Sequence, residues 1–235
     1  MWHELIKEMQ QQQAFIDLLA RGWATEYAAA GGRIHCARGC RGCCSLAVNC
    51  TFTEAVAIAG ALTGEQAERV RDHVARLRAG IDGVTELKEY LLRHRRLVGF
   101  CPFLAEDGAC GIYSLRPLAC RALLSTKESR WCSADFSGLS AGEKGAFLAS
   151  LDRSVVAFPM HYVAAMQEAG EELEAAASRR MAERCGFSLY GSMPVLVHLA
   201  EDHGLAAACP AGYDAVARLL EATSLNHPLL LHVGR

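Results

Sequence analysis

Apolar residues recur at helical spacing along most of the chain. Over residues 2–30 they stand three, four or seven positions apart, and Gly31 and Gly32 follow directly. A glycine after the last periodic residue is typical of a helix end, because glycine readily adopts the left-handed backbone that closes a helix. The pattern predicts a long amphipathic helix with this apolar face: Leu5, Met9, Ile16, Leu19, Trp23 and Tyr27.

Signals for further helices follow along the chain. Thr51 with Glu54 three residues later resembles a capping box, which begins a helix with reciprocal hydrogen bonds. Residues 64–80 and 85–99 are amphipathic at the helical period. From about residue 140 to the end, four or five more helices are expected. The predicted breaks between them lie near these residues: Pro159, Gly186, Gly204 and Pro210.

Residues 98–121 interrupt the helical pattern. Asp107 and Gly108 stand between two short apolar runs, which predicts a small hairpin that turns at residues 105–108. Pro117 suits the first turn of a following short helix, where its missing N–H costs nothing.

Cysteines gather in two blocks around this interruption. The chain has 11 cysteines, and the stretch CARGCRGCC places four of them in nine residues. On a helix these four would share one face as a buried stripe, but Gly39 and Gly42 weaken a helix there and let backbone N–H groups turn toward an anionic centre. Arg33, Arg38 and Arg41 stand beside the thiols, which favours the thiolate form. The eight candidate metal ligands are Cys36, Cys40, Cys43, Cys44, Cys101, Cys110, Cys120 and Cys132.

The spacing of the cysteines bears on which metal they bind. Zinc sites usually draw on paired C-x-x-C knuckles, and the downstream block has no second knuckle. Iron–sulfur clusters often take three thiolates from one loop and a fourth from a distant Cys-Pro, for which Cys101 is a candidate. An iron–sulfur cluster is therefore favoured over zinc. Since the adjacent Cys43 and Cys44 are hard to place on one ion, the eight thiols could serve two centres, or one centre plus redox thiols.

Other readings of the residues are weaker. The spacing C-x3-C-x2-C is similar to that of radical S-adenosylmethionine enzymes, but the alternating strands and helices of their barrel are missing from the pattern. The remaining cysteines, Cys50, Cys185 and Cys209, are isolated in apolar surroundings and are expected to be structural. His35 beside Cys36 is more typical of an exposed or supporting residue than of a ligand.

The two cysteine blocks together resemble a known family. CARGCRGCC followed by CPFLAEDGACGIYSLRPLACR is similar to the YkgJ-like cysteine-cluster family, a zinc- or iron-chelating domain with a CxxxCxxCC signature. The resemblance covers about residues 31–132 and implies metal binding by the cysteines of both blocks, with Cys132 as the eighth. A related cysteine cluster occurs in flagellin lysine methylases, which leaves an enzymatic role open. Arg116 and Arg121 belong to the signature, and we expect these two cofactor-binding candidates to be charge partners of the thiolates.

These observations predict a mainly α protein with an irregular, cysteine-rich metal-binding lobe that contains a short β-hairpin. Residues 1–135 would form the metal-binding domain with the N-terminal helix, and residues 136–235 a helical region packed on it. The function expected is that of a cytoplasmic metal-binding protein, with a redox or protein-modifying role or, as the alternative, that of a structural zinc-binding interaction module.

Charge and hydropathy narrow the expected partners. The formal net charge is -2, so no basic footprint for nucleic acid or an anionic membrane is expected. The first ten residues lack the pattern of a secretory signal, and no apolar run is long enough to cross a bilayer. The expected partners are a metal ion or cluster and a protein or redox partner.

Overall fold

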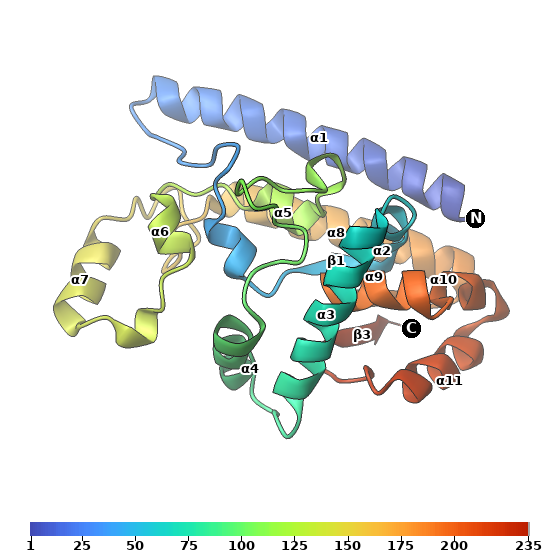
Figure 1. Ribbon diagram of the computed structural model, residues 1–235. Coiled ribbons are helices and arrows are strands. Elements are labelled where there is room, and N and C mark those ends of the chain that lie inside the picture. The colour runs from blue at the N-terminus through green and yellow to red at the C-terminus, as the bar shows by residue number, and fades with distance from the viewer. Residues whose placement is uncertain (235) are drawn as a thin grey trace.

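The computed structural model describes residues 1–234, and most of them are helical. Helix α1 (Trp2–Ala29) runs along one side of the molecule, beside α8 (Ala164–Cys185) (Figure 1). It ends just before Gly31, whose φ of +85° is the left-handed conformation expected of a glycine stop. Leu5, Met9 and Ile16 are buried on its inner face, which confirms the predicted N-terminal helix.

The next helices begin with capping boxes. Thr51 caps α2 (Phe52–Ala59): its hydroxyl accepts from the Glu54 N–H, and the Glu54 carboxylate accepts from the Thr51 N–H at 2.9 Å, which confirms the prediction. The same motif begins α3 (Gly64–Ile81). Then α4 (Leu87–Arg93) continues into η2 (His94–Val98), a single π turn.

Short elements and turns make up the cysteine-rich part of the chain. In the predicted hairpin, Leu104 pairs with Cys110 in a single antiparallel bridge, and the Ala105 N–H donates to the Ala109 carbonyl at 2.8 Å. The hairpin is therefore confirmed. The other elements of this part are η1 (Gly42–Ser45), η3 (Tyr113–Leu115), α5 (Leu118–Ala122), α6 (Ser129–Cys132), η4 (Phe136–Gly138) and α7 (Ala141–Ala149).

The helices of the C-terminal half break close to the predicted positions. Gly186 ends α8 with φ of +79°, and Gly204 has φ of +64° between α9 (Met193–Asp202) and α10 (Leu205–Ala208). Pro210 lies in η5 (Cys209–Ala211), which precedes α11 (Tyr213–Thr223).

Three short strands form an antiparallel sheet that the hydrophobic pattern does not predict. The strands are β1 (Asn49–Thr51), β2 (Ser188–Ser192) and β3 (Leu231–Gly234), in the order β1-β2-β3. Each is too short for its alternation to stand out among helical residues. Gly191 is required in β2, because a Cβ there would lie 2.8 Å from the Leu231 Cα.

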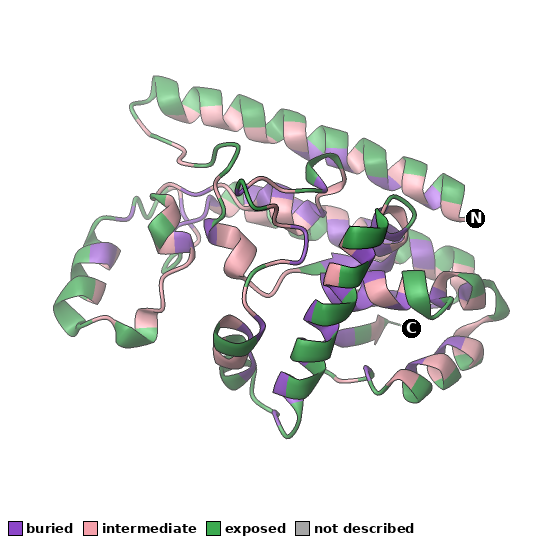
Figure 2. Cartoon of the chain, in the orientation of Figure 1, coloured by how far each residue is buried: buried purple, intermediate pink, exposed green. Residues whose placement is uncertain are grey.

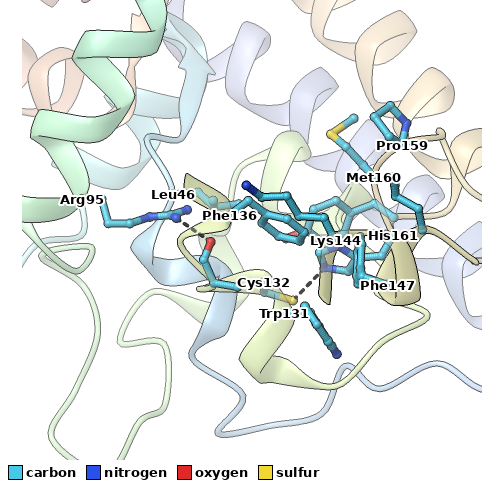
Figure 3. Close-up of a pocket in the computed structure, with 13 residues that line it drawn as sticks. Leu46, Arg95, Trp131, Cys132, Phe136, Lys144, Phe147, Pro159, Met160 and His161 are labelled. Carbon is cyan, nitrogen blue, oxygen red and sulfur yellow. Dashed lines mark hydrogen bonds between the residues drawn. The ribbon is translucent and has the colours of Figure 1, made fainter. Parts of the chain in front are cut away.

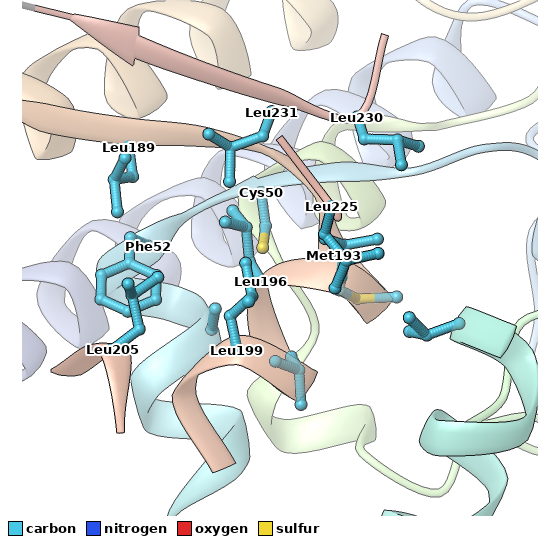
Figure 4. Close-up of a cluster of buried hydrophobic side chains, with 14 of the residues drawn as sticks. Cys50, Phe52, Leu189, Met193, Leu196, Leu199, Leu205, Leu225, Leu230 and Leu231 are labelled. Carbon is cyan, nitrogen blue, oxygen red and sulfur yellow. The ribbon is translucent and has the colours of Figure 1, made fainter. Parts of the chain in front are cut away.

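The main hydrophobic core lies between this sheet and the helices α2, α3 and α9. Phe52, Leu189 and Leu196 are fully buried in it, together with the thiol-bearing Cys50 (Figure 4). Purple, buried residues accordingly gather around α2 and α9 in Figure 2, whereas α7 and the outer face of α1 are largely exposed. This core joins residues from both sides of residue 135, and the predicted division into two domains stays a prediction.

A smaller core connects α1, α5 and α8. Ile16, Leu118 and Met166 are fully buried in it, so α5 is clamped between the two long helices. Over residues 1–234, no helix is both long and apolar enough to cross a membrane.

Candidate metal centre

The first cysteine block forms a loop and not a helix. The Cys40 N–H donates to the Ala37 carbonyl at 3.0 Å, and Gly39 between them has φ of +82°. The chain then enters η1, which carries Cys43 and Cys44. The four thiols of this block therefore do not form a stripe on one helix face.

Glycine at position 42 lets this loop touch α6. A Cβ on Gly42 would lie 2.8 Å from the Ser129 Oγ and 2.9 Å from the Cys132 Cβ, closer than a side chain tolerates. The Cys40 thiol also donates to the Ser129 hydroxyl at 3.3 Å. Cys132, remote in sequence, is thereby held against the first block.

Cys36, Cys40 and Cys132 make up the first thiol group. Although Cys36 is exposed as a residue, its thiol contacts the backbone of the next segment: the Ser125 N–H donates to its Sγ at 3.2 Å. Burial, together with the charges of Cys43, Cys132 and Cys40, raises the pKa of the Cys36 thiol to about 11, against the Ser125 hydrogen bond, which lowers it. Burial also raises the pKa of Cys132, against hydrogen bonds with Ser125 and Tyr162 that lower it.

Cys101, Cys110 and Cys120 make up the second thiol group, around the hairpin and α5. Burial is the main cause that raises the pKa of each of the three thiols. The charges of Cys120 and Cys110 also raise the pKa of Cys101. The Cys101 N–H donates to the Cys44 carbonyl at 2.7 Å, which ties this group to the first block.

Cys43 stands between the two groups. Its charge raises the pKa of Cys36 and Cys132 in the first group and of Cys101, Cys110 and Cys120 in the second. The pKa of Cys43 itself is raised, chiefly by its hydrogen bond with Cys44 and then by burial. The structure thus brings the eight predicted cysteines into one lobe, in two groups joined at Cys43 and Cys44.

The two signature arginines lie in different surroundings. Arg116 stacks on the Tyr113 ring, 3.9 Å from its centroid, and its charge lowers the pKa of Cys43 and Cys110 against the effect of burial. Arg121 is buried, and its guanidinium pairs with Asp17 of α1 and donates to the Arg116 carbonyl at 2.7 Å. Arg116 is thus placed as a charge partner of thiols, whereas the partners of Arg121 are oxygens.

The arginines of the first block lie at the surface. Arg33, Arg38 and Arg41 are exposed, and the charge that lowers the pKa of Cys43 and Cys110 comes from Arg116. Exposed guanidinium groups are screened by water, which weakens their effect on a partly buried thiol.

Two residues beside the thiols carry no signal in the sequence. The His161 Nε2 lies 3.4 Å from the Cys132 Sγ, and Tyr162 is a hydrogen-bond neighbour of the same thiol. Both are buried, and burial lowers the pKa of His161 to about 4. They reach Cys132 from the segment before α8, so that only the fold brings them to the lobe.

The donor set has the chemistry of a metal site. Thiolate sulfur is a ligand of zinc and of iron–sulfur clusters alike. As the side chains stand, no three or more Cys, His, Asp or Glu side chains within residues 1–234 converge closely enough to hold a metal ion. All eight cysteines of the lobe are free thiols.

The comparisons with known proteins point to the same lobe. Residues 35–135 match the model of a family named CxxCxxCC and described as "Putative zinc- or iron-chelating domain". The match includes all eight cysteines of the lobe, although the first two are separated by three residues here and by two in the family name. No curated protein and no solved structure matches the chain.

Proposed function

We propose that residues 35–135, which match the model of the CxxCxxCC zinc- or iron-chelating domain, form a domain of that family and bind two iron–sulfur centres through the eight cysteines of the lobe. The observation that carries the proposal is the position of Cys43 and Cys44 between two groups of three thiols. One thiol of this adjacent pair added to each group gives two sets of four, the number of thiolates that a cubane cluster requires.

The first set would comprise Cys36, Cys40 and Cys132, and the second Cys101, Cys110 and Cys120. Cys43 and Cys44 are adjacent on η1, and two adjacent thiolates are hard to place on one ion, so the pair suits two centres better than one. The Cys44 carbonyl accepts from Cys101, which favours Cys44 as the fourth ligand of the second set.

Iron–sulfur is favoured over zinc by the character of the donors. The downstream cysteines stand nine, ten and twelve positions apart and form no C-x-x-C knuckle, whereas Cys101 is followed by Pro102. When bound, such a cluster supplies one-electron transfer at a potential set by burial and by hydrogen bonds to its sulfurs. The chain's own part is to hold the sulfurs, and Arg116 offsets their negative charge.

Metal loading on this lobe is coupled to proton release. Burial raises the pKa of Cys36, Cys101, Cys120 and Cys132 above the ordinary thiol value. These thiols are therefore protonated at neutral pH without metal, and ligation requires them to lose their protons.

Eleven free cysteines suit a reducing compartment, which supports a cytoplasmic location. A redox partner, or a protein substrate as the methylase relationship suggests, would complete the role.

The second candidate function is a structural zinc module. Two observations support it. The same family description includes zinc, and the loops of the lobe are irregular and have few helices of their own to hold them. A closed zinc site would fix these loops and contribute folding energy without any redox chemistry.

Elemental analysis of variants tests both candidates. We expect the protein purified without oxygen and without a metal-affinity tag to hold iron and acid-labile sulfide and to absorb visible light. Cys40→Ser should remove about half of the iron and leave the second centre, and Cys110→Ser should remove the other half. Cys185→Ser, outside the lobe, is the matched control and should keep all of it.

The pattern of losses separates the readings. If either variant loses all of its iron, a single shared centre replaces two. Zinc without sulfide or colour would establish the structural module. Full metal content in both lobe variants would remove these cysteines from the ligand set.

A further inference from the structure

A cavity of about 400 Å³ lies beside Cys132, between α6, α7 and the segment of residues 159–162. Figure 3 shows its lining: Arg95 and Leu46 lie at one end of the row of side chains and Met160 and Pro159 at the other. This volume is within the range of small-molecule sites, which are concave and mostly apolar. The cavity borders the lobe of thiols but is not needed to hold them.

Aromatic rings form the walls of the cavity. The rings of Trp131 and Phe147 lie 4.5 Å apart between centroids, and those of Phe136 and Phe147 lie 4.9 Å apart in an edge-to-face arrangement. His161 packs on Phe147 from the other side, at 5.8 Å. Rings in contact with one another hold a wall rigid, and their faces and edges suit a flat apolar molecule.

Positive charge lies at the edge of this apolar space. Arg95 lines the cavity and is oriented by a hydrogen bond to the Ala134 carbonyl at 2.5 Å. Lys144 of α7 also lines it, and within residues 1–234 it forms no ion pair. No Asp or Glu of the described chain lines the cavity, and Asp135, whose pKa is lowered chiefly by hydrogen bonds from Ser137 and also by the charge of Arg95, is shared with Arg96 at 3.7 Å. Cations therefore outnumber anions around the cavity.

We propose that this cavity binds a small molecule with an aromatic or apolar body and a carboxylate, with the carboxylate held by Arg95 and Lys144. Hydrogen bonds between ionised partners are about twice as strong as neutral ones, so two cations that line an apolar pocket select for a carboxylate over an uncharged group. The body would lie against Trp131, Phe136 and Phe147.

The cavity adjoins the first thiol group. Cys132 and His161 line it too, so a bound molecule would lie next to the first thiol group. The inference itself rests on the cavity and its charges and not on the presence of a metal.

Calorimetric titration with two probes tests it. The probes are 4-phenylbutyrate and its neutral amide, 4-phenylbutyramide, titrated into the full chain as purified. We expect the carboxylate to bind about tenfold more tightly than the amide. Arg95→Met and Lys144→Met should each weaken the carboxylate by about tenfold and leave the amide unchanged. Lys7→Met, on exposed α1, is the matched control and should change neither.

A second variant tests the cavity apart from its charge. Leu148 lines the space and is only partly buried, so Leu148→Trp should fill it and abolish the binding of both probes while circular dichroism stays the same. Equal affinity of the two probes, no binding of either up to its solubility limit, or unchanged binding in the Arg95, Lys144 and Leu148 variants would each overturn the proposal. Metal analysis of the same samples distinguishes the two proposals. If the protein as purified holds no metal and still binds the carboxylate, the metal centre is rejected and the carboxylate site stands.

Discussion

The main hydrophobic core and the cysteine lobe are built on opposite principles. In the core, side chains of α2, α3, α9 and the sheet interlock, and residues such as Phe52, Leu189 and Leu196 are completely buried. In the lobe, turns and short helices hold thiols of which most are only partly buried. One region has regular backbone and apolar contacts, and the other has irregular backbone and chemically active groups.

The difference shows that the main core supplies stability and the cysteine lobe supplies the chemically active groups. Regular elements satisfy their own backbone and bury apolar surface, whereas loops on a rigid scaffold are free to present functional groups. The two regions are joined by α5, which is anchored by the small core with Ile16 and by the Arg121–Asp17 ion pair. Glu54 of α2 adds a further link, since its carboxylate accepts from the Leu118 N–H at 2.7 Å.

The largest expected effect is in the main core. Phe52→Ala removes a fully buried ring that packs edge-on against Trp2, 5.5 Å away between centroids. The free energy of unfolding, measured by urea titration, should fall by about 3–5 kcal/mol, because a cavity remains where the ring was. Phe15→Ala, at a ring that is 56% exposed, should change it by less than about 0.5 kcal/mol. Equal losses of unfolding free energy in the two variants would show that the buried ring of Phe52 contributes no more to stability than the exposed ring of Phe15.

A smaller effect on stability, with a larger one on metal content, is expected at the contact between the first block and α6. Gly42→Ala places a methyl group against Ser129 and Cys132. The overpacking should cost about 1–3 kcal/mol and reduce the iron or zinc bound per chain, since it moves Cys132 away from Cys40. Gly145→Ala in α7 is the matched control: a Cβ there meets nothing within 4 Å, and metal content should not change. Unchanged metal content in Gly42→Ala would show that Cys132 is not a ligand of the first set.

The last expected effect, at the junction of the two regions, is a change in how stability depends on pH. Glu174 is buried near Glu54, and burial, followed by the charge of Glu54, raises its pKa from 4.5 to about 8. Between these values the folded chain keeps a proton that the unfolded chain has released, so this residue makes stability fall as pH rises from 4.5 to about 8. Its share of the slope is at most about 1.4 kcal/mol per pH unit.

Glu174→Gln removes this titration. Its free energy of unfolding, measured by urea titration at several pH values, should decline less with pH over that window than that of the wild type. Glu172→Gln, on the exposed face of the same helix, should keep the wild-type slope. A slope in Glu174→Gln that matches the wild type would show that Glu174 is ionised in the folded protein at neutral pH.

Local signals in the sequence determined the helices and their ends. The glycine stop after α1, the Thr51–Glu54 capping box and the breaks at Gly186 and Gly204 depend on neighbours within one or two turns, so the sequence alone predicts them. The cysteines of both blocks were recognisable for the same reason, because residue type and spacing are visible without a fold. The hairpin at Asp107 and Gly108 followed from its turn residues.

Tertiary structure alone decided what depends on distant segments. The sheet pairs β1 with β2, about 140 positions later in the chain, and β2 with β3, about 40 positions later still, and strands of three to five residues have too few positions for a pattern of their own. His94, which stands among basic residues in the sequence, is buried against His73, and burial lowers its pKa to about 4. His161 and Tyr162 reach Cys132, and the cavity forms beside them, because packing brings together residues that no local rule relates.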